Sequence, residues 1–496
     1  MATRASPLAS PASESDYGSD LDSEVVLQAL SELESAPVAS LALESIRDDA
    51  LHAAAVRLPV LLSSDPGGKS PPLSPKHIEI GYSPGPGDDA RKEDLAEPSL
   101  VEPKPNRHTA LDERSPLERF RTSPKKPLSV TDMVSPAWCE LQYWYTLTKH
   151  GRKRRTSAMK QGSKVHKQLE DQVHRKVEVA VKSREDAWGL KIWNIIQGLR
   201  ILRQTGQTRE LEVWGVIDGQ VINGIIDELS YRCSDEALEE LALARLNRLK
   251  SQPASQTSIP QFFQAQGAVD LEPKSWTDEA HQQRKVWITD VKTRGSKTLP
   301  QGSLMRPTTM QLMMYRKLLA ELAANLVDAE TIFKRYRLRS SENFTDAFVA
   351  EMAGLDSNSQ DDHDALLSSQ GGAVSQLLAH NSLLKLWGLM IEEFHRTIPG
   401  PGAIGQVLRA EFRHQQTGDI LGSKTLVYDE STLDIYLGEE MRWWRGERKA
   451  KGVDIEEAFK CRTCEFAEEC GWRKDKVEEA TDNHRKKRAV RSKSAV

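Results

Sequence analysis

Long hydrophobic runs, cysteine and net charge are all scarce in this chain of 496 residues. No apolar run approaches the roughly 20 residues that cross a bilayer, so we expect no membrane association. The stretch after Met1 also lacks the basic start and the apolar core of a secretion signal. The formal net charge of −4 does not indicate a nucleic-acid partner, so any such partner must be recognised by a local basic patch.

Apolar residues make up only 38% of the chain and are unevenly distributed. Residues 1–126 are rich in serine, proline and acidic residues, a composition that cannot bury enough apolar surface to offset chain entropy. We therefore predict a disordered tail over 1–126 and a folded domain over 127–480. The domain carries a largely polar insertion at 233–284, and a basic tail follows at 481–496.

The spacing of apolar residues predicts both helices and strands in the folded domain. Ser129 and Asp132 have the spacing of a helix start. Asp218-Gly219 separates two strand-like runs and is a tight hairpin signal. The expected strands are 210–217, 221–231, 330–338, 407–414 and 424–428, and the expected helices are 236–249, 308–325, 374–394 and 433–449.

The run V-W-I-T-D-V-K-T, residues 286–293, predicts a strand that carries an acid and a lysine. Asp290 and Lys292 are two residues apart, so a strand would place both side chains on one face. A solvated strand face is the ordinary explanation of such a pair. A nuclease site is the alternative, and the residues on either side of the strand decide between the two.

Other candidate site residues occur on both sides of this strand. His166 and Glu170 are four apart in a helical pattern that opens near Gly162, so both could approach one metal ion, although a histidine at a helix start usually packs or caps. Asp227 falls inside an apolar strand, where a carboxylate must be neutralised, paired or bound to metal. A divalent cation shared by Asp227 and Asp290 is the simplest interpretation. Further along, Gln311 and Tyr315 are one helical turn apart and alone indicate little.

Three of the five cysteines, Cys461, Cys464 and Cys470, fall within ten residues. This density indicates a soft metal, because thiolates two residues apart can bind one ion or cluster. Cys139, in an aromatic-rich segment, is the best candidate for a fourth ligand, ahead of Cys233. A zinc site and an iron-sulfur cluster both fit the spacing.

The polar insertion contains a second kind of motif, Q-T-S-I-P-Q-F-F. Gln256, Ile259, Phe262 and Phe263 have the spacing of a one-turn hydrophobic plug and resemble the PCNA-interacting box of replication and repair proteins. A loop that tucks its phenylalanines into its own core is the alternative. The resemblance implies a PCNA-type sliding clamp as a partner.

Taken in order, these motifs resemble the RecB branch of the PD-(D/E)xK nucleases and, within it, the exonuclease V family. The resemblance rests on the series G-x3-H-x3-E, Asp227, D-x-K, Q-x3-Y and the split cysteines, and it covers about 128–476 without the insertion. It implies an α/β restriction-endonuclease-like core, a mixed central sheet flanked by helices, with helical additions and a C-terminal iron-sulfur staple. Asp290 departs from the glutamate that is usual at its position, which shortens the reach of that carboxylate by one methylene.

The resemblance also implies an activity, cofactors and residue roles. The chain is expected to be a monomeric, Mg²⁺-dependent exodeoxyribonuclease that hydrolyses single-stranded DNA in DNA repair, with one or two Mg²⁺ ions and a [4Fe-4S] cluster, for which Zn²⁺ is the alternative. The implied catalytic residues are Lys292, Asp290, Asp227, Glu170, His166, Gln311 and Tyr315. The implied Mg²⁺ ligands are Asp227, Asp290, His166 and Glu170, and the implied cluster ligands are Cys139, Cys461, Cys464 and Cys470.

Local charge and aromatic residues add expectations about DNA and location. A basic run at 149–164 could bind phosphates, with a solvated loop as the alternative. Trp138, Tyr143, Trp144 and Tyr145 could either stack unpaired bases or pack around the cluster. A catalytically weak DNA-binding scaffold recruited by a clamp is the competing function. The sequence R-K-K-R at 485–488 resembles a nuclear import signal, which predicts the nucleus, with the mitochondrion as the alternative.

Overall fold

The computed structural model describes residues 55–59, 112–153, 157–179, 181–251, 284–357 and 373–493. The predicted clamp-binding box, with Gln256, Ile259, Phe262 and Phe263, lies outside the described residues. Among the helices that are described, none combines the length and the apolar character needed to cross a membrane.

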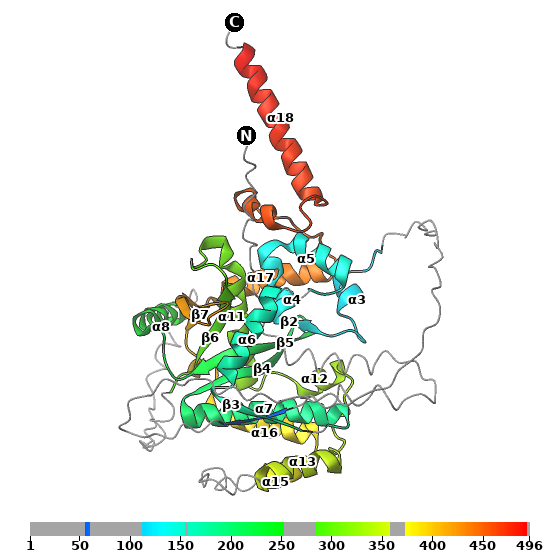
Figure 1. Ribbon diagram of the computed structural model, residues 1–496, viewed down its shortest axis with the longest axis vertical. Helices are drawn as coiled ribbons and strands as arrows, with labels where there is room; N and C mark the ends of the chain where they lie inside the picture. The colour runs from blue at the N-terminus through cyan, green and yellow to red at the C-terminus, as the bar shows by residue number, and fades with distance from the viewer. Residues whose placement is uncertain are drawn as a thin grey trace, which may run out of the picture. The chain divides into compact units, whose positions relative to one another are not determined.

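A mixed six-stranded sheet lies at the centre of the folded domain (Figure 1). Its strands are β2 (Leu128–Ser129), β4 (Gln207–Ile217), β5 (Gln220–Ser230), β6 (Trp287–Arg294), β7 (Val407–His414) and β8 (Ile420–Val427). The order is β2-β5-β6-β7-β8, with β4 also paired to β5. Because β6 and β7 are parallel while β4–β5, β5–β6 and β7–β8 are antiparallel, the expected mixed sheet is confirmed.

Helices flank this sheet, and the chain also forms a two-stranded sheet from β1 (Ala55–Pro59) and β3 (His174–Glu178). The helices of the first half are α3 (Pro116–Phe120), α4 (Val130–Val134), α5 (Pro136–His150), α6 (Ser157–Glu170), α7 (Arg184–Thr205) and α8 (Glu236–Ser251). Those of the second half are α11 (Arg306–Ala323), α12 (Ala329–Arg335), α13 (Asp346–Ser357), α15 (Ala373–Ala379), α16 (Leu383–Thr397), α17 (Glu430–Trp444) and α18 (Gly471–Lys493). Figure 1 shows α7 and α16 side by side, consistent with their contacts.

The β4–β5 hairpin forms where the turn signal predicts it. Asp218 and Gly219 both adopt positive φ angles, 52° and 74°, as a two-residue turn of the type that matches strand twist requires. The two strands keep the same register on both sides of Glu210 and Asp227, which are the one skipped pair. A helix start at Ser129 is confirmed too, since its side chain accepts from the backbone N–H of Asp132 and the Asp132 carboxylate accepts from the backbone N–H of Ser129.

Helix α11 packs across the sheet because two strand glycines admit it. A Cβ atom at Gly224 would lie 2.9 Å from a ring carbon of Tyr315, and one at Gly215 would overlap Leu318. Residues of α11 contact β4, β5, β6 and β7. The close approach fixes α11, and with it Gln311 and Tyr315, over the middle of the sheet.

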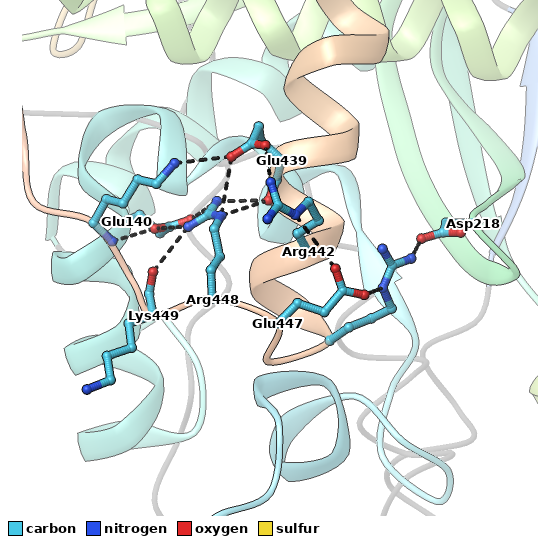
Figure 2. A network of polar contacts seen from close by, with 9 residues as sticks. Glu140, Asp218, Glu439, Arg442, Glu447, Arg448 and Lys449 are labelled. Atoms are coloured by element: carbon cyan, nitrogen blue, oxygen red, sulfur yellow. Dashed lines mark hydrogen bonds and ion pairs between the residues drawn. The ribbon is translucent and has the colours of Figure 1, made fainter.

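Figure 2 shows a polar network that ties α5 to the segment after α17. Glu140 of α5 accepts two hydrogen bonds from the guanidinium of Arg448, each 2.7 Å long. Arg448 also donates to the backbone carbonyl of Glu439 at 2.8 Å. Arg445 pairs with Asp218 in the β4–β5 turn, so the network extends from the N-terminal helices to the central hairpin.

Three predictions about local structure are wrong. Residues 330–338 form α12 and its C-terminal turn rather than a strand, because Asp328 caps the helix by accepting from the backbone N–H of Thr331. The single helix expected at 374–394 is two helices, since Ser382 caps a new helix at Leu383. His166 lies in the second half of α6, one turn before its end, and not near a helix start, because the helix begins at Ser157 and ends at Glu170.

The two predicted tails also contain regular structure. Strand β1 and helix α3 lie within 1–126, so the expectation of disorder throughout that range is wrong for them. Composition misses β1 because its backbone partner, β3, is more than a hundred residues away. The basic tail predicted at 481–496 is helical to Lys493, as part of α18.

Candidate functional site

The acid–lysine pair lies on β6, in the middle of the sheet. Lys292 Nζ is 3.0 Å from Asp290 Oδ2, so the two side chains share a face of the strand. Asp290 is 0% exposed and Lys292 5% exposed. Such burial excludes a solvated strand face as the explanation of this pair.

Asp227 reaches the same place from the neighbouring strand β5. Its Oδ2 atom accepts a hydrogen bond of 2.6 Å from the backbone N–H of Val291. Val291 is the residue between Asp290 and Lys292. Among the described residues, no hydrogen-bond donor satisfies the buried Oδ1 atom of Asp227. That oxygen is 3.8 Å from Nδ1 of His166 on α6. A buried carboxylate with one unsatisfied oxygen beside an imidazole is suited to a cation.

The sequence did not identify the third member of this group, Glu210 on β4. Its Oε1 atom is 3.6 Å from Nδ1 of His166, and one ligand atom from each of His166, Glu210 and Asp227 lies within 4.8 Å of the others. Glu210 and Asp227 are equidistant from the Asp218-Gly219 turn, so the hairpin register sets them opposite each other. The sequence held a signal for Glu210, because it precedes Asp218 by as many residues as Asp227 follows Gly219.

Glu210 also has an unusual backbone. Its φ angle is +53°, in the left-handed region that costs a residue with a side chain about 1–2 kcal/mol. Glu210 lies within a strand that is otherwise regularly paired. Strain of this kind persists where the surrounding structure imposes it, and it gathers at functional sites.

Glu170, the other predicted Mg²⁺ ligand, is engaged differently. It is the last residue of α6 and 3% exposed. Its Oε1 atom is 2.8 Å from Nε of Arg57 on β1. The structure therefore brings together His166, Asp227, Asp290 and Lys292, adds Glu210, and gives Glu170 an arginine partner.

Burial dominates the electrostatics of the two aspartates. Burial, only partly offset by the ammonium group of Lys292, raises the pKa of Asp290 to about 7, and the Asp227 carboxylate adds to the rise. Burial likewise raises the pKa of Asp227, against the attraction of His166. Each aspartate therefore holds a proton more tightly than a solvated carboxyl does, and a bound cation would displace that proton.

Gln311 and Tyr315 lie together on α11, as the helical spacing predicts. The side-chain amide of Gln311 donates to the hydroxyl of Tyr315 at 2.9 Å, and both residues are buried. Tyr315 lies against β5 at Gly224. The pair thus anchors α11 on the strand that carries Asp227.

The four predicted cluster ligands line a single pocket. Cys139 of α5 faces Cys461, Cys464 and Cys470 across it, and Cys233 is not among the lining residues. All four are free thiols. Burial raises the pKa of Cys139 to about 11, and burial together with the neighbouring thiols raises the pKa of Cys464. Four thiols around one pocket are the donor set of a tetrahedral zinc ion or an iron-sulfur cluster.

Cys139 occupies a break in its helix that other residues hold open. Its φ and ψ angles, −165° and 109°, are not helical. On one side of the break, Lys460 donates to the backbone carbonyl of Trp138 at 3.1 Å. On the other, the N–H of Leu141 donates to the carbonyl of Lys451 at 2.9 Å. These bonds satisfy backbone groups that the helix leaves free, so Cys139 faces the pocket in a preformed cradle.

The aromatic residues around Cys139 pack within the protein. Tyr143 is 5% exposed, and its hydroxyl donates to Asp132. The Tyr145 ring lies 5.5 Å from Phe466, and the Trp138 ring lies under the ammonium of Lys460. The geometry of these three residues favours packing within the protein over base stacking, and Tyr145 lines the thiol pocket itself.

Comparison with known proteins gives one matching family model and several relatives. A family model described as "Exonuclease V - a 5' deoxyribonuclease" matches residues 115–473. The chain is 25% identical over 370 residues to exonuclease V of Danio rerio, which covers 73% of each chain. It is 22% identical over 411 residues to mitochondrial exonuclease V of Eremothecium gossypii, covering 71% of this chain and 77% of the relative. Mitochondrial exonuclease V of Candida glabrata is 21% identical over 418 residues, covering 71% and 81%.

Proposed function

Since the chain belongs to the exonuclease V family, we propose that it is a metal-dependent exodeoxyribonuclease that hydrolyses single-stranded DNA in DNA repair. The observation that carries the proposal is the convergence of His166, Glu210 and Asp227 beside the buried Asp290–Lys292 pair. The mixed sheet and the D-x-K motif on β6 also support a core of the PD-(D/E)xK type. A catalytically weak scaffold would be expected to lose Asp227, Asp290 or Lys292, and all three are present.

In this proposal the buried acids bind one or two Mg²⁺ ions. Asp227, Asp290, Glu210 and His166 would supply the ligands, and three carboxylates offer the hard oxygens that Mg²⁺ prefers. When bound, the ion polarises the phosphate and favours ionisation of the attacking water. Glu170 is a less direct participant, because its carboxylate pairs with Arg57.

Lys292 would act on the water and the phosphate. Its ammonium group, held 3.0 Å from Asp290, can orient a water molecule by hydrogen bonding and offset the negative charge that develops on the phosphate. Gln311 and Tyr315 would keep α11 in place behind the strands. The role proposed for these two residues is to position the acids and Lys292, or the DNA backbone.

The test is a cleavage assay with single-stranded DNA, Mg²⁺ and one substituted aspartate. We expect Asp290→Asn to lower kcat by at least about 100-fold, since it removes a ligand charge and the partner of Lys292. Asp419→Asn, at an exposed position beside β8, is the matched control and should cleave like the wild type. Labels at the 5' and the 3' end would report polarity. Equal cleavage by the Asp290 variant, or none by the wild type, would refute the proposal.

We further propose that the thiol pocket holds a [4Fe-4S] cluster, with Zn²⁺ as the alternative. Four thiols lining one pocket support a bound metal, and their spacing fits both. Visible absorbance with iron in the purified protein would support the cluster. A colourless protein with one equivalent of zinc would support the alternative.

The proposals for location and partners rest on the names of relatives and on sequence motifs. The fungal relatives are named mitochondrial, which favours the mitochondrion for this chain, while the nucleus stays a prediction from residues 485–488 alone. A sliding-clamp partner likewise rests on the box at 256–263. The monomeric state also stays a prediction.

A further inference from the structure

Strand β1 is fixed to the folded domain on both of its sides. On one side it pairs antiparallel with β3 over its whole length. On the other, Asn194 of α7 accepts from the N–H of Arg57 and donates to the carbonyl of Ala55, both at 3.0 Å. Val56 is 1% exposed and belongs to the main hydrophobic core. A segment of the N-terminal region is thus built into the domain by backbone pairing and burial.

The side chain of Arg57 extends from this strand to two acidic residues of the candidate metal site. Its Nε atom is 2.8 Å from Glu170 Oε1. Its Nη1 atom donates to the backbone carbonyl of Glu210, also at 2.8 Å. The side chains of Arg57 and Glu170 are 12% and 4% exposed, so water screens this pair little.

The contact with Glu210 falls where the backbone needs support. Glu210 has a φ angle of +53° and lies opposite Asp227. The residue before it, Arg209, is held by His174 of β3, whose ring Nε2 is 3.2 Å from the Arg209 carbonyl oxygen. The small β1–β3 sheet therefore contacts the peptide groups on both sides of Glu210, through the Arg209 carbonyl and the Glu210 carbonyl.

Charge gives a second reason for an arginine here. Glu170 follows His166 by one helical turn, and Glu210 and Asp227 lie beside that histidine. A further carboxylate near these two and Asp290 would repel them unless a cation balanced it. The guanidinium of Arg57 balances Glu170 and leaves Glu210 and Asp227 to face His166.

We propose that Arg57 is a positioning residue for the metal site, supplied by a strand of the N-terminal region. It fixes the strained backbone of Glu210 and neutralises Glu170, so that the carboxylates of Glu210 and Asp227 stay poised for one divalent cation. This inference rests on the metal-dependent function proposed above. Full affinity for Mg²⁺ then requires β1, although β1 lies far from the nuclease motifs in the sequence.

The test compares full-length Arg57→Ala with wild type in two measurements: Mg²⁺ binding by calorimetry, and cleavage as a function of Mg²⁺ concentration. We expect the half-saturating Mg²⁺ concentration to rise at least about 10-fold, because the ion pair with Glu170 and the charge-assisted hydrogen bond to the Glu210 carbonyl are both lost. The kcat at saturating Mg²⁺ should stay within about 3-fold of wild type, because Arg57 acts on Glu170 and on the Glu210 backbone, whereas Asp290 and Lys292 pair with each other on β6. Arg57→Lys should recover part of the affinity.

Two further variants separate positioning from folding. Arg114→Ala, at an exposed arginine that pairs with Asp112 two residues earlier, should leave Mg²⁺ affinity unchanged. Asn194→Ala loosens β1 without removing a charge, so it should weaken Mg²⁺ binding in the same direction but less, and it keeps the proposal testable if Arg57→Ala misfolds.

Each outcome has a defined meaning. Unchanged Mg²⁺ affinity in a folded Arg57→Ala protein overturns the inference and leaves the proposed nuclease intact. Tighter Mg²⁺ binding also overturns it, because Arg57 would then compete with the cation for Glu170. A wild-type protein that neither binds Mg²⁺ nor cleaves DNA overturns the proposed function itself.

Discussion

At the scale of single residues, the candidate site depends on side chains whose environment differs from that of most acids. Asp227 and Asp290 are buried and hold their protons tightly. Glu210 joins them from a backbone conformation that favours glycine. Glycine would be less strained at this position. That a glutamate is found there, facing a buried aspartate and a histidine, indicates that its carboxylate has a function.

We therefore predict that Glu210→Gly separates stability from metal binding. Glycine adopts positive φ without strain, which offsets its larger loss of chain entropy, so the free energy of unfolding should stay within about 1 kcal/mol of wild type or rise. Mg²⁺ affinity should fall at least about 10-fold. Denaturant unfolding and calorimetry provide the two measurements.

Glu212→Gly is the matched control, two residues further along the same strand. Glu212 pairs with Lys191 at 3.0 Å, and its backbone has no positive φ, so glycine there should lower the free energy of unfolding by about 1 kcal/mol or more. A lower free energy of unfolding for Glu210→Gly than for Glu212→Gly would contradict the claim that the backbone at Glu210 is strained.

At the scale of elements, one buried carboxylate joins three helical segments. Asp132 caps α4 through Ser129, accepts from Arg121 just after α3, and accepts from Tyr143 of α5. Burial alone would raise the pKa of Asp132, but the ion pair with Arg121 and these hydrogen bonds outweigh burial and lower it. Since α5 also carries Cys139, this junction holds one side of the thiol pocket.

We predict that Asp132→Asn lowers the free energy of unfolding by about 3 kcal/mol near pH 7, because it leaves the Arg121 charge buried without its partner. A carboxyl with a lowered folded pKa stabilises fully above its unfolded pKa, and that contribution is lost as pH falls through the folded value. The gap between variant and wild type should therefore narrow below about pH 4.

Denaturant unfolding between pH 3 and pH 7 measures this gap. Asp328→Asn is the control, at the exposed cap of α12, where asparagine caps about as well as aspartate and should cost less than about 0.5 kcal/mol. If the difference in free energy of unfolding between Asp132→Asn and wild type widened toward low pH, the ionised Asp132 carboxylate would not be its source.

At the scale of the whole molecule, the thiol pocket joins parts of the chain that are far apart in sequence. Cys139 lies near the start of the nuclease region, and Cys461, Cys464 and Cys470 lie near its end. The network in Figure 2 runs alongside, since Glu140 next to Cys139 binds Arg448. A metal bound here would link α5 to the segment between α17 and α18, two parts of the chain whose cysteines are more than 300 residues apart.

We expect Cys464→Ala to lose the bound metal, to lower the Tm by about 10 °C, and to weaken single-stranded DNA binding together with stability. Thermal melts, metal analysis and fluorescence anisotropy with labelled DNA measure the three effects. Cys233→Ala, outside the pocket, should change none of them. A Cys464→Ala protein with unchanged Tm and DNA affinity would contradict a structural role for the pocket.

Local patterns were sufficient for several elements. The run V-W-I-T-D-V-K-T located β6, the Asp218-Gly219 signal located the β4–β5 hairpin, and the Ser129–Asp132 spacing located a helix start. These features depend on residues that are neighbours in sequence. Predictions were wrong where a cap overrode periodicity, as at Asp328, or where the partner of a strand was remote, as for β1.

By itself, the sequence determined which chemical groups the protein possesses: an acid–lysine strand, a buried aspartate, a histidine and clustered thiols. Only the tertiary structure decided how they combine. Folding selected Cys139 over Cys233 for the pocket, brought Glu210 opposite Asp227 in a strained conformation, and paired Glu170 with Arg57. These outcomes depend on side chains that meet across long stretches of chain, and neither composition nor spacing encodes such contacts directly.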